Sequence, residues 1–299
     1  MGFDPLTDEF SIRAGAVRLH DLGYLIAGND KLDEDDVAHT AVFEWDETTK
    51  GWGGYDLSWI ATSACVCDYP KEQMVAIGRF GQFLVFGQHE EYEGVIKAKP
   101  TPSGTPAPFR GARSIAGKAY AVGMNSHVFR RDARTTWVAD DQGIKPKTDL
   151  EAIDGFAEDD LYAVGWKGAM WKKKGKRWSK IESPSNLILT DVCCAGNGLV
   201  YVCGQAGTLL RGRDDEWEVI AHESTEADLW DVEWFNDELY VSTTQFLYKL
   251  NDKDELKLVK FGSDRPKSCY KLSTRDGVMW SIGPKDVMSF NGKKWTRIT

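Results

Sequence analysis

Groups capable of catalysis or metal binding are few in this sequence, and they lack the spacings that such chemistry requires. The five histidines are His20, His39, His89, His127 and His222. They form neither a His-Glu-x-x-His nor a His-x-His pattern. No glycine-rich phosphate loop precedes a helical pattern. We therefore predict no metal, no nucleotide and no other cofactor.

The six cysteines are typical of core residues. Cys65 and Cys67 would share one face of a strand, whereas Cys193 and Cys194 would point to opposite faces. Neither pair supplies the two Cys-x-x-Cys units of a zinc site. Thiols of this kind indicate a reducing compartment. Because no N-terminal signal sequence is recognisable, the expected location is the cytoplasm.

The composition describes a globular chain with an excess of acid. Of the 299 residues, 42% are hydrophobic and 28% are charged, and no run of about 20 apolar residues indicates a membrane helix. The net charge of −9 disfavours nucleic acid or an anionic membrane as the main partner and suits a basic protein. We expect a monomer that binds neither nucleic acid nor a membrane.

One tetrapeptide recurs along almost the whole chain and indicates its architecture. Two copies read Tyr-Ala-Val-Gly and end at Gly123 and Gly165. Looser copies end at Gly28, Gly78, Gly204, Thr243 and Gly283, and we call these seven end positions the anchors. Consecutive anchors lie 39 to 50 residues apart. A tryptophan follows several of them by 12 to 14 residues, as Trp178 follows Gly165. These spacings define seven repeats.

Each repeat consists of short alternating segments between polar turns, without a helical period. The fourth repeat predicts strands over 150–155, 161–165, 169–173 and 177–181. Four antiparallel strands in each of seven units are typical of an all-β, seven-bladed β-propeller. We expect one domain over 1–299, with an N-terminal extension over 1–12 and blades over approximately 13–57, 58–99, 109–140, 148–183, 187–222, 228–261 and 267–299.

The repeat unit resembles the degenerate repeats of bacterial WD-like propellers, including the Asp-box repeats of neuraminidases and the repeats of photosystem II assembly factors. It reads Leu-Tyr-Ala-Val-Gly, a turn, Gly-x-Leu-x-Arg, a second turn and a tryptophan. The resemblance implies the fold only, because hydrolases, lectins, assembly factors and inhibitors share it. The segment Asp132 to Trp137 lacks the Asp-box glycine, and Asn291 to Trp295 lacks its aspartate.

A neuraminidase-like site would need arginines that hold a carboxylate, a tyrosine nucleophile and paired acids in the central channel. The early-strand positions expected there carry Glu151, Asp191, Asp231 and Lys271 rather than three arginines. We therefore predict no catalytic residues and no enzymatic activity. A carbohydrate-active propeller, either a lectin or a glycoside hydrolase, is the alternative.

A basic run from Lys172 to Arg177 resembles a nucleic-acid patch. It falls in the predicted hairpin between the third and fourth strands of one repeat, where charges commonly form a solvated edge that discourages pairing between sheets. Together with the acidic balance of the chain, this position argues against a nucleic-acid partner.

Two insertions extend the repeats and are expected on the same face of a propeller. Residues 29–40 join the second and third strands of the first repeat and contain Asp30, Asp33, Glu34, Asp35 and Asp36. Residues 97–110 join the second and third repeats and contain Pro100, Pro102, Pro106 and Pro108, a stiff composition. Loops added to a repeat scaffold usually carry its recognition surface.

Trp166 occupies the turn after Gly165, where the equivalent residues of other repeats are Met124, Gln205 and Pro284. A tryptophan there is either a packing residue at the blade edge or a contact anchor. We predict a partner-binding surface that consists of the five acidic residues of the first insertion with Arg79, His127, Trp166 and Lys167.

An acidic loop beside a stiff loop suits the capture of a basic protein, although the loop could equally be a solvated, mobile insertion. The expected function is that of a non-catalytic protein-binding propeller. Among such proteins we favour an inhibitor or immunity protein that captures a basic toxin domain.

Overall fold

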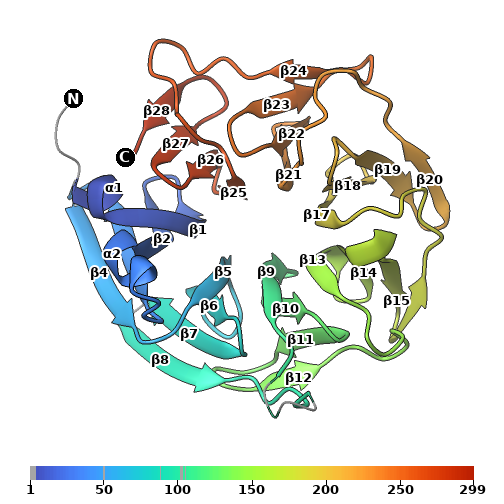
Figure 1. Ribbon diagram of the computed structural model, residues 1–299, viewed down its shortest axis with the longest axis horizontal. Coiled ribbons are helices and arrows are strands. Elements are labelled where there is room, and N and C mark those ends of the chain that lie inside the picture. The colour runs from blue at the N-terminus through green and yellow to red at the C-terminus, as the bar shows by residue number, and fades with distance from the viewer. Residues whose placement is uncertain (1–4, 50, 88, 102–103, 105) are drawn as a thin grey trace.

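The computed structural model describes residues 5–49, 51–87, 89–101, 104 and 106–299, which form seven four-stranded antiparallel sheets around a central channel (Figure 1). The predicted all-β, seven-bladed propeller is confirmed. Each sheet follows the order of the chain, from an innermost strand at the channel to an outermost strand at the rim. All four strands of the last blade come from the C-terminal part of the chain, so the ring closes without a shared strand.

The strands of blades 1 to 4 are β1 (Phe10–Leu19), β2 (Leu22–Asn29), β3 (Thr40–Asp46), β4 (Gly51–Leu57), β5 (Ala61–Cys67), β6 (Gln73–Gly78), β7 (Gln82–Gly87), β8 (Glu90–Val95), β9 (Phe109–Ile115), β10 (Lys118–Gly123), β11 (His127–Arg131), β12 (Trp137–Ala139), β13 (Leu150–Ala157), β14 (Asp160–Gly165), β15 (Met170–Lys174) and β16 (Arg177–Lys180). Those of blades 5 to 7 are β17 (Leu189–Cys194), β18 (Val200–Gly204), β19 (Leu209–Arg213), β20 (Glu216–Val219), β21 (Asp231–Phe235), β22 (Glu238–Ser242), β23 (Leu247–Leu250), β24 (Leu256–Leu258), β25 (Lys271–Arg275), β26 (Val278–Gly283), β27 (Asp286–Phe290) and β28 (Trp295–Arg297).

Helical structure in the described residues is confined to three short segments. They are α1 (Pro5–Glu9), α2 (Asp30–Glu34) and the single 3-10 turn η1 (Trp166–Gly168). No helix in these ranges is long and apolar enough to cross a membrane.

The second strand of each blade is apolar on both faces because the neighbouring blades cover it from both sides. In β14 the residues from Leu161 to Val164 are all buried. Gly165 ends this strand where a Cβ atom would lie 2.1 Å from the carbonyl oxygen of Asp149, so only glycine permits this approach of the incoming connection. The recurring glycine of the repeat thus has a packing role.

The innermost strands expose one backbone edge to the channel, and side chains of the preceding blade accept hydrogen bonds from N–H groups on this edge. Two serines and two aspartates supply the accepting oxygens. The four bonds run from Ala112 N to Ser63 Oγ (3.0 Å), from Cys194 N to Asp154 Oδ2 (2.7 Å), from Val232 N to Asp191 Oδ2 (3.0 Å) and from Val17 N to Ser273 Oγ (3.0 Å). They form a belt that links successive blades at the channel wall.

The first blade begins at Phe10, three residues earlier than the predicted start at 13. Strand β1 closes the ring against the last blade, and its Ile12 N–H donates to the carbonyl oxygen of Pro284 (2.8 Å). Leu6 of α1 is buried in the same seam with Trp280 and Ile282. The rest of the predicted extension, residues 1–4, lies outside the described residues.

Candidate partner-binding face and central channel

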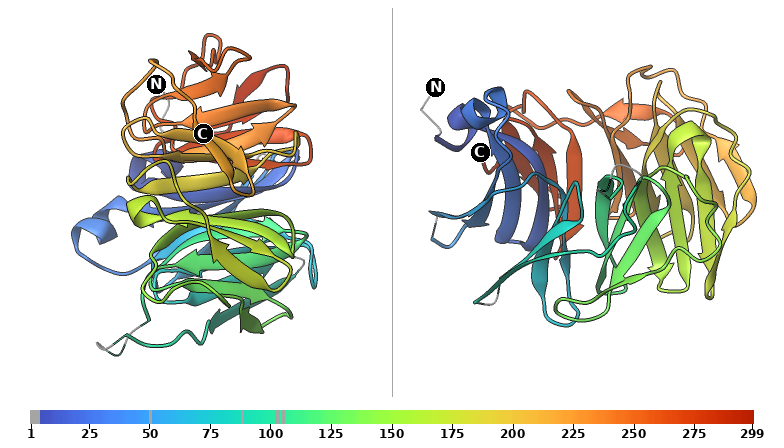
Figure 2. Two further views of the ribbon diagram at one scale, coloured as in Figure 1. Left: turned by 90° about the vertical axis from the view of Figure 1, so that its right-hand side faces the viewer. Right: turned by 60° about the horizontal axis from the view of Figure 1, so that its bottom comes forward.

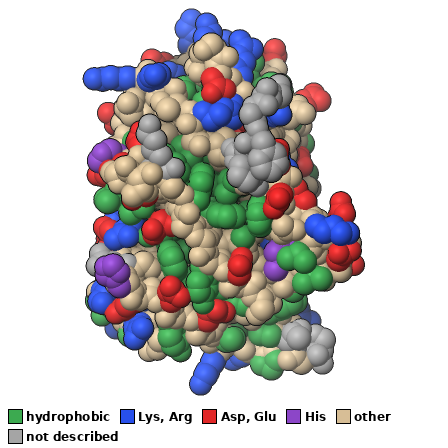
Figure 3. Space-filling model, turned by 90° about the vertical axis from the view of Figure 1, so that its left-hand side faces the viewer, with side chains coloured by type: hydrophobic (Ala, Val, Ile, Leu, Met, Phe, Trp, Pro, Cys, Tyr) green, Lys and Arg blue, Asp and Glu red, His purple; other side chains and the backbone are tan. Residues whose placement is uncertain are grey.

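One face of the propeller carries α2, η1 and the connections between blades, and we call it the α2 face. Helix α2 projects from this face in side view (Figure 2). Seen from the side of the first blade, blue and red side chains gather together on the projection at the right edge (Figure 3). The acidic insertion predicted from the sequence is therefore partly helical and projects from the α2 face.

Helix α2 is held at its start by local hydrogen bonds. The Asn29 side chain accepts from the backbone N–H groups of Lys31 and Leu32, as an N-cap does. His39 receives the backbone N–H of Asn29 on Nε2 (2.5 Å). These bonds fix the direction in which the acidic residues leave the first blade.

The five acidic residues divide into two groups. Asp30 pairs with Lys285 of the last blade (2.5 Å) and Asp33 pairs with Arg13 of β1 (2.5 Å). Burial acts to raise the pKa of Asp30, but the hydrogen bonds from Lys285 and Ser11 outweigh it and leave the pKa below its ordinary value. Asp30 and Asp33 therefore hold α2 against the ring.

The second group faces solvent. It consists of Glu34, Asp35 and Asp36, all exposed. Among the described residues, Lys31 lies within 4.0 Å of Glu34 and Asp35, at 3.8 Å and 3.3 Å. These three carboxylates are the part of the insertion available to a partner.

His127 does not belong to the partner-binding surface, contrary to the prediction. Only 5% of it is exposed, and its ring stacks on Phe109 with a centroid distance of 5.1 Å. Burial lowers the pKa of the imidazole, so the neutral form is favoured. The ring packs against Phe109 and Phe129, which belong to the same blade as His127.

Trp166 and Lys167 lie together in η1, on the α2 face of blade 4. The backbone N–H of Trp166 donates to the carbonyl oxygen of Asp149 (2.9 Å), in the connection that enters the blade. The backbone N–H of Gly168 donates to the carbonyl oxygen of Leu187 (2.7 Å), in the connection that leaves it. Both side chains are exposed, Trp166 to 40%. Of the two alternatives for Trp166, exposure favours a contact anchor over a packing residue.

Arg79 is also exposed on this face, and its backbone carbonyl accepts from Phe109 N (2.8 Å). Arg110, which follows Phe109 in the chain, pairs with Glu151 (2.9 Å). The other oxygen of Glu151 accepts a hydrogen bond from the indole N–H of Trp166 (2.5 Å). A continuous set of contacts thus runs from Arg79 to Trp166 along the mouth of the channel. Helix α2 belongs to blade 1, so it lies three blades from η1, whereas Arg79 belongs to blade 2, beside the blade of α2 (Figure 1).

The basic run of β15 is largely neutralised by carboxylates. Lys172 pairs with Asp215 (2.8 Å), Lys174 with Asp160 (2.9 Å), and Lys173 with Asp140 (2.6 Å). Lys173 is only 3% exposed, so the prediction of a solvated edge is wrong for this residue. Lys172 and Lys174, its neighbours in the strand, point to the opposite face of the sheet, because side chains alternate along a strand.

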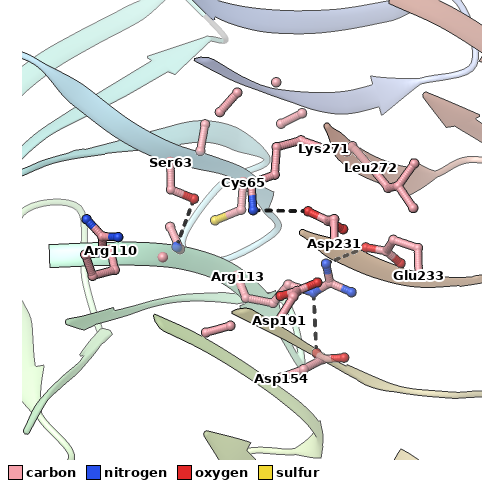
Figure 4. Close-up of a pocket in the computed structure, with 18 of the residues that line it drawn as sticks. Ser63, Cys65, Arg110, Arg113, Asp154, Asp191, Asp231, Glu233, Lys271 and Leu272 are labelled. Atoms are coloured by element: carbon pink, nitrogen blue, oxygen red, sulfur yellow. Dashed lines mark hydrogen bonds and ion pairs between the residues drawn. The ribbon is translucent and has the colours of Figure 1, made fainter. Parts of the chain in front are cut away.

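The central channel has a volume of about 1140 Å³ and contains a group of charged side chains at its middle (Figure 4). Arg113 of β9 contacts Glu233 and lies 3.5 Å from Asp154, measured from Nε to Oδ1. Lys271 Nζ lies 3.4 Å from Asp231 Oδ2. Burial raises the pKa of Asp231 and of Glu233, and the nearby Asp191 raises that of Asp231 further.

The two cations at the middle of the channel, Arg113 and Lys271, each pair with a carboxylate of the chain. The arginines that line the channel in the described residues each lie within 4.0 Å of a carboxylate of the chain, in the pairs Arg13–Asp33, Arg110–Glu151, Arg113–Asp154 and Arg275–Asp68. A sialidase-type grip on a substrate carboxylate would require breaking such pairs. No group of three or more His, Cys, Asp or Glu in the described residues is arranged to hold a metal ion.

Sequence reasoning missed Arg113, Asp154 and Glu233 as channel residues. The signal for them was the two-residue period of the innermost strands, in which Asp231 and Glu233 must share one face. Lys145 and Lys147 were also missed, and they lie near Lys167 at a pocket described below.

No protein-family model matches the chain. Solved structures that resemble it are propellers: the WD40 domain of Doa1 (TM-score 0.68, 10% identity, 97% of this chain and 92% of that one) and YCF48 from Cyanidioschyzon merolae (TM-score 0.67, 11% identity, 94% and 95%). At such low identity they establish the fold alone.

A curated relative is much more similar. The immune protein Tsi7 of Pseudomonas aeruginosa is 44% identical over 302 aligned residues, which include 98% of this chain and 98% of Tsi7. A match of this identity over the whole length places both proteins in one family. The chain therefore belongs to the family of the immune protein Tsi7.

Proposed function

We propose that this chain is an immunity protein that binds a toxin protein and neutralises it. The observation that carries the proposal is the 44% identity to an immune protein along nearly the whole of both chains. The alignment covers 98% of each chain, so neither protein has an additional domain that the other would need for a shared function. The propeller acts in this proposal as a rigid binding scaffold without catalysis.

The toxin binds across the α2 face. Glu34, Asp35 and Asp36 attract a basic region of the toxin, and exposed carboxylates at an interface rim act mostly on the rate of association. Trp166 is the anchor, because a half-exposed tryptophan fixed by a hydrogen bond has the properties of an interface hot spot. The complex forms in the cytoplasm, where the chain is a monomer before binding.

The test uses the protein encoded by the gene beside this one as the candidate toxin. That protein is expressed in bacterial cytoplasm from an inducible promoter, with and without this chain, and growth is recorded. We expect growth arrest without the chain and growth with it, together with a stable complex on size-exclusion chromatography. The WD40 domain of Doa1, which shares the fold at 10% identity, is the matched control and must not protect.

A neighbour that arrests growth equally with and without this chain, and that forms no complex with it, would refute the proposal. A glycan array on the same preparation tests the carbohydrate-active alternative. Specific glycan binding without protection from the toxin would favour a lectin.

A further inference from the structure

A second pocket lies on the α2 face beside Trp166, between the connections that enter and leave blade 4. Its volume is about 300 Å³. Four lysines line it: Lys145 and Lys147 from the connection between β12 and β13, Lys167 from η1, and Lys180 from the end of β16. Trp166 belongs to the walls of both this lysine pocket and the central channel.

The lining of the lysine pocket also contains two carboxylates, Asp149 and Glu182, but most of its positive charge has no carboxylate partner within 4.0 Å. Lys180 pairs with Glu182 (3.2 Å). Of the other three, none lies within 4.0 Å of a carboxylate among the residues that the structure describes, and all three are exposed. The lysines of β15, by contrast, each have a carboxylate partner.

Three like charges around one small pocket repel one another, and that repulsion is relieved when an anion enters. The indole of Trp166 adds an apolar wall. Because Trp166 is 40% exposed, its ring can cover the aliphatic part of an entering side chain. Carboxylates on short aliphatic stems, those of aspartate and glutamate, match this combination.

We propose that the lysine pocket binds an acidic segment of the same protein partner whose basic region contacts α2. This inference rests on the proposed function and specifies the partner, which must carry opposite charges on two separated regions. The spacing follows from the ring, since α2 belongs to blade 1 and η1 to blade 4 (Figure 1). A partner docked in the reverse orientation would place its acidic segment against α2 and its basic region against the lysine pocket, and both contacts would be repulsive. The arrangement therefore fixes the orientation of the partner.

The test measures binding of a fluorescein-labelled peptide with six glutamates separated by glycines, by fluorescence anisotropy at low ionic strength. The test variant combines Lys145→Glu, Lys147→Glu and Lys167→Glu. The matched control combines Lys176→Glu, Lys253→Glu and Lys293→Glu, three exposed lysines at turns between third and fourth strands, on the opposite face. Both variants change the net charge equally.

We expect the wild-type chain and the control to bind the peptide, and the test variant to bind it at least roughly tenfold more weakly, because it presents like charge to the peptide. No binding by the wild-type chain, or equal weakening in both variants, would overturn the inference. So would an oligothymidylate that binds the wild-type pocket more tightly than the peptide, since phosphates would then be the preferred ligand.

The outcome is separable from that of the growth test. Protection from the neighbouring toxin without peptide binding would leave the proposed function intact and remove the lysine pocket from it. Peptide binding confined to the lysine pocket, without protection, would leave an anion site on a protein of another function.

Discussion

The indole N–H of Trp166 donates to Glu151 Oε1 at 2.5 Å, while the other oxygen of Glu151 accepts from Arg110 Nε at 2.9 Å. Glu151 is held in place by two donors, and its side chain is only 13% exposed. Trp166 is thus fixed at its polar end and 40% exposed overall. An aromatic side chain held in one position loses little conformational freedom on binding, which favours affinity.

Trp166→Ala should therefore weaken partner binding by about 2 kcal/mol or more, the cost of removing an aromatic hot spot. The melting temperature should change little because the side chain is not buried between blades. Isothermal titration calorimetry and a thermal melt measure the two effects. A loss of roughly 3 to 5 kcal/mol of folding free energy, the cost typical of a buried aromatic residue, would instead identify a packing role.

Neutralising the exposed carboxylates of α2 should slow association. The variant combines Glu34→Gln, Asp35→Asn and Asp36→Asn, and its association rate should fall and depend less steeply on salt. The melting temperature should not change, since these residues face solvent. Stopped-flow measurements at several ionic strengths test this. Unaltered rates and salt dependence would show that the basic region of the partner contacts another part of the face.

Unlike the neutralisation of the exposed carboxylates of α2, Asp30→Asn should lower the stability of the fold and have a smaller effect on the association rate. The pKa of Asp30 is below its ordinary value in the fold, so its ion pair with Lys285 stabilises the chain above the unfolded pKa of about 4. This contribution is lost as the pH falls through the lower, folded value. Because the Asp30 side chain is 39% exposed, we expect less than about 1 kcal/mol at pH 7.

Urea unfolding of the wild-type chain and of Asp30→Asn at pH 7 and at pH 3 tests this sign. The difference in unfolding free energy should be larger at pH 7. A difference that grows on acidification would contradict the proposed role of the ionised carboxylate.

The repeat could be recognised from the sequence because its landmarks have local physical causes. Gly165 ends β14 where no Cβ fits, and the apolar run before it is buried on both faces. The strand predicted over 161–165 accordingly differs by one residue from β14. Such constraints act within one blade, and they recur at each anchor.

Contacts between residues that are distant in the chain carried no comparable signal. His127 follows a polar turn and was expected at the surface, yet its ring stacks on Phe109, which is 18 positions earlier in the chain. Lys145 and Lys147 lie in an irregular connection without periodicity. Their approach to Lys167 depends on how that connection passes over blade 4, which the sequence pattern does not determine.

The belt of hydrogen bonds at the channel wall predicts a cost for removing its acceptors. In Asp191→Ala the buried N–H of Val232 loses its acceptor at 3.0 Å, which should cost roughly 1 to 3 kcal/mol of unfolding free energy. Asp191→Asn keeps a carbonyl oxygen at the same place and should cost less. Chemical denaturation of both variants measures the difference. Equal losses would indicate that the charge of Asp191, rather than its hydrogen bond, stabilises the wall.

Leu6→Ala tests whether α1 helps to close the ring. Leu6 is 5% exposed and packs with Trp280 and Ile282 of the last blade and with Ile12 of the first, so it covers the seam where the chain's two ends meet. Truncation of a buried leucine costs roughly 2 to 5 kcal/mol. In a chain of this size that loss should lower the melting temperature by several degrees.

The matched control for this seam is Glu9→Ala, which changes an exposed residue of the same helix. It should leave the melting temperature nearly unchanged. If both variants melt like the wild-type chain, α1 contributes nothing to closure, and the hydrogen bond from Ile12 to Pro284 and the side chains of β1 and β26 hold the seam without it. If both are destabilised alike, the stabilisation comes from α1 as a helix rather than from the buried Leu6 side chain.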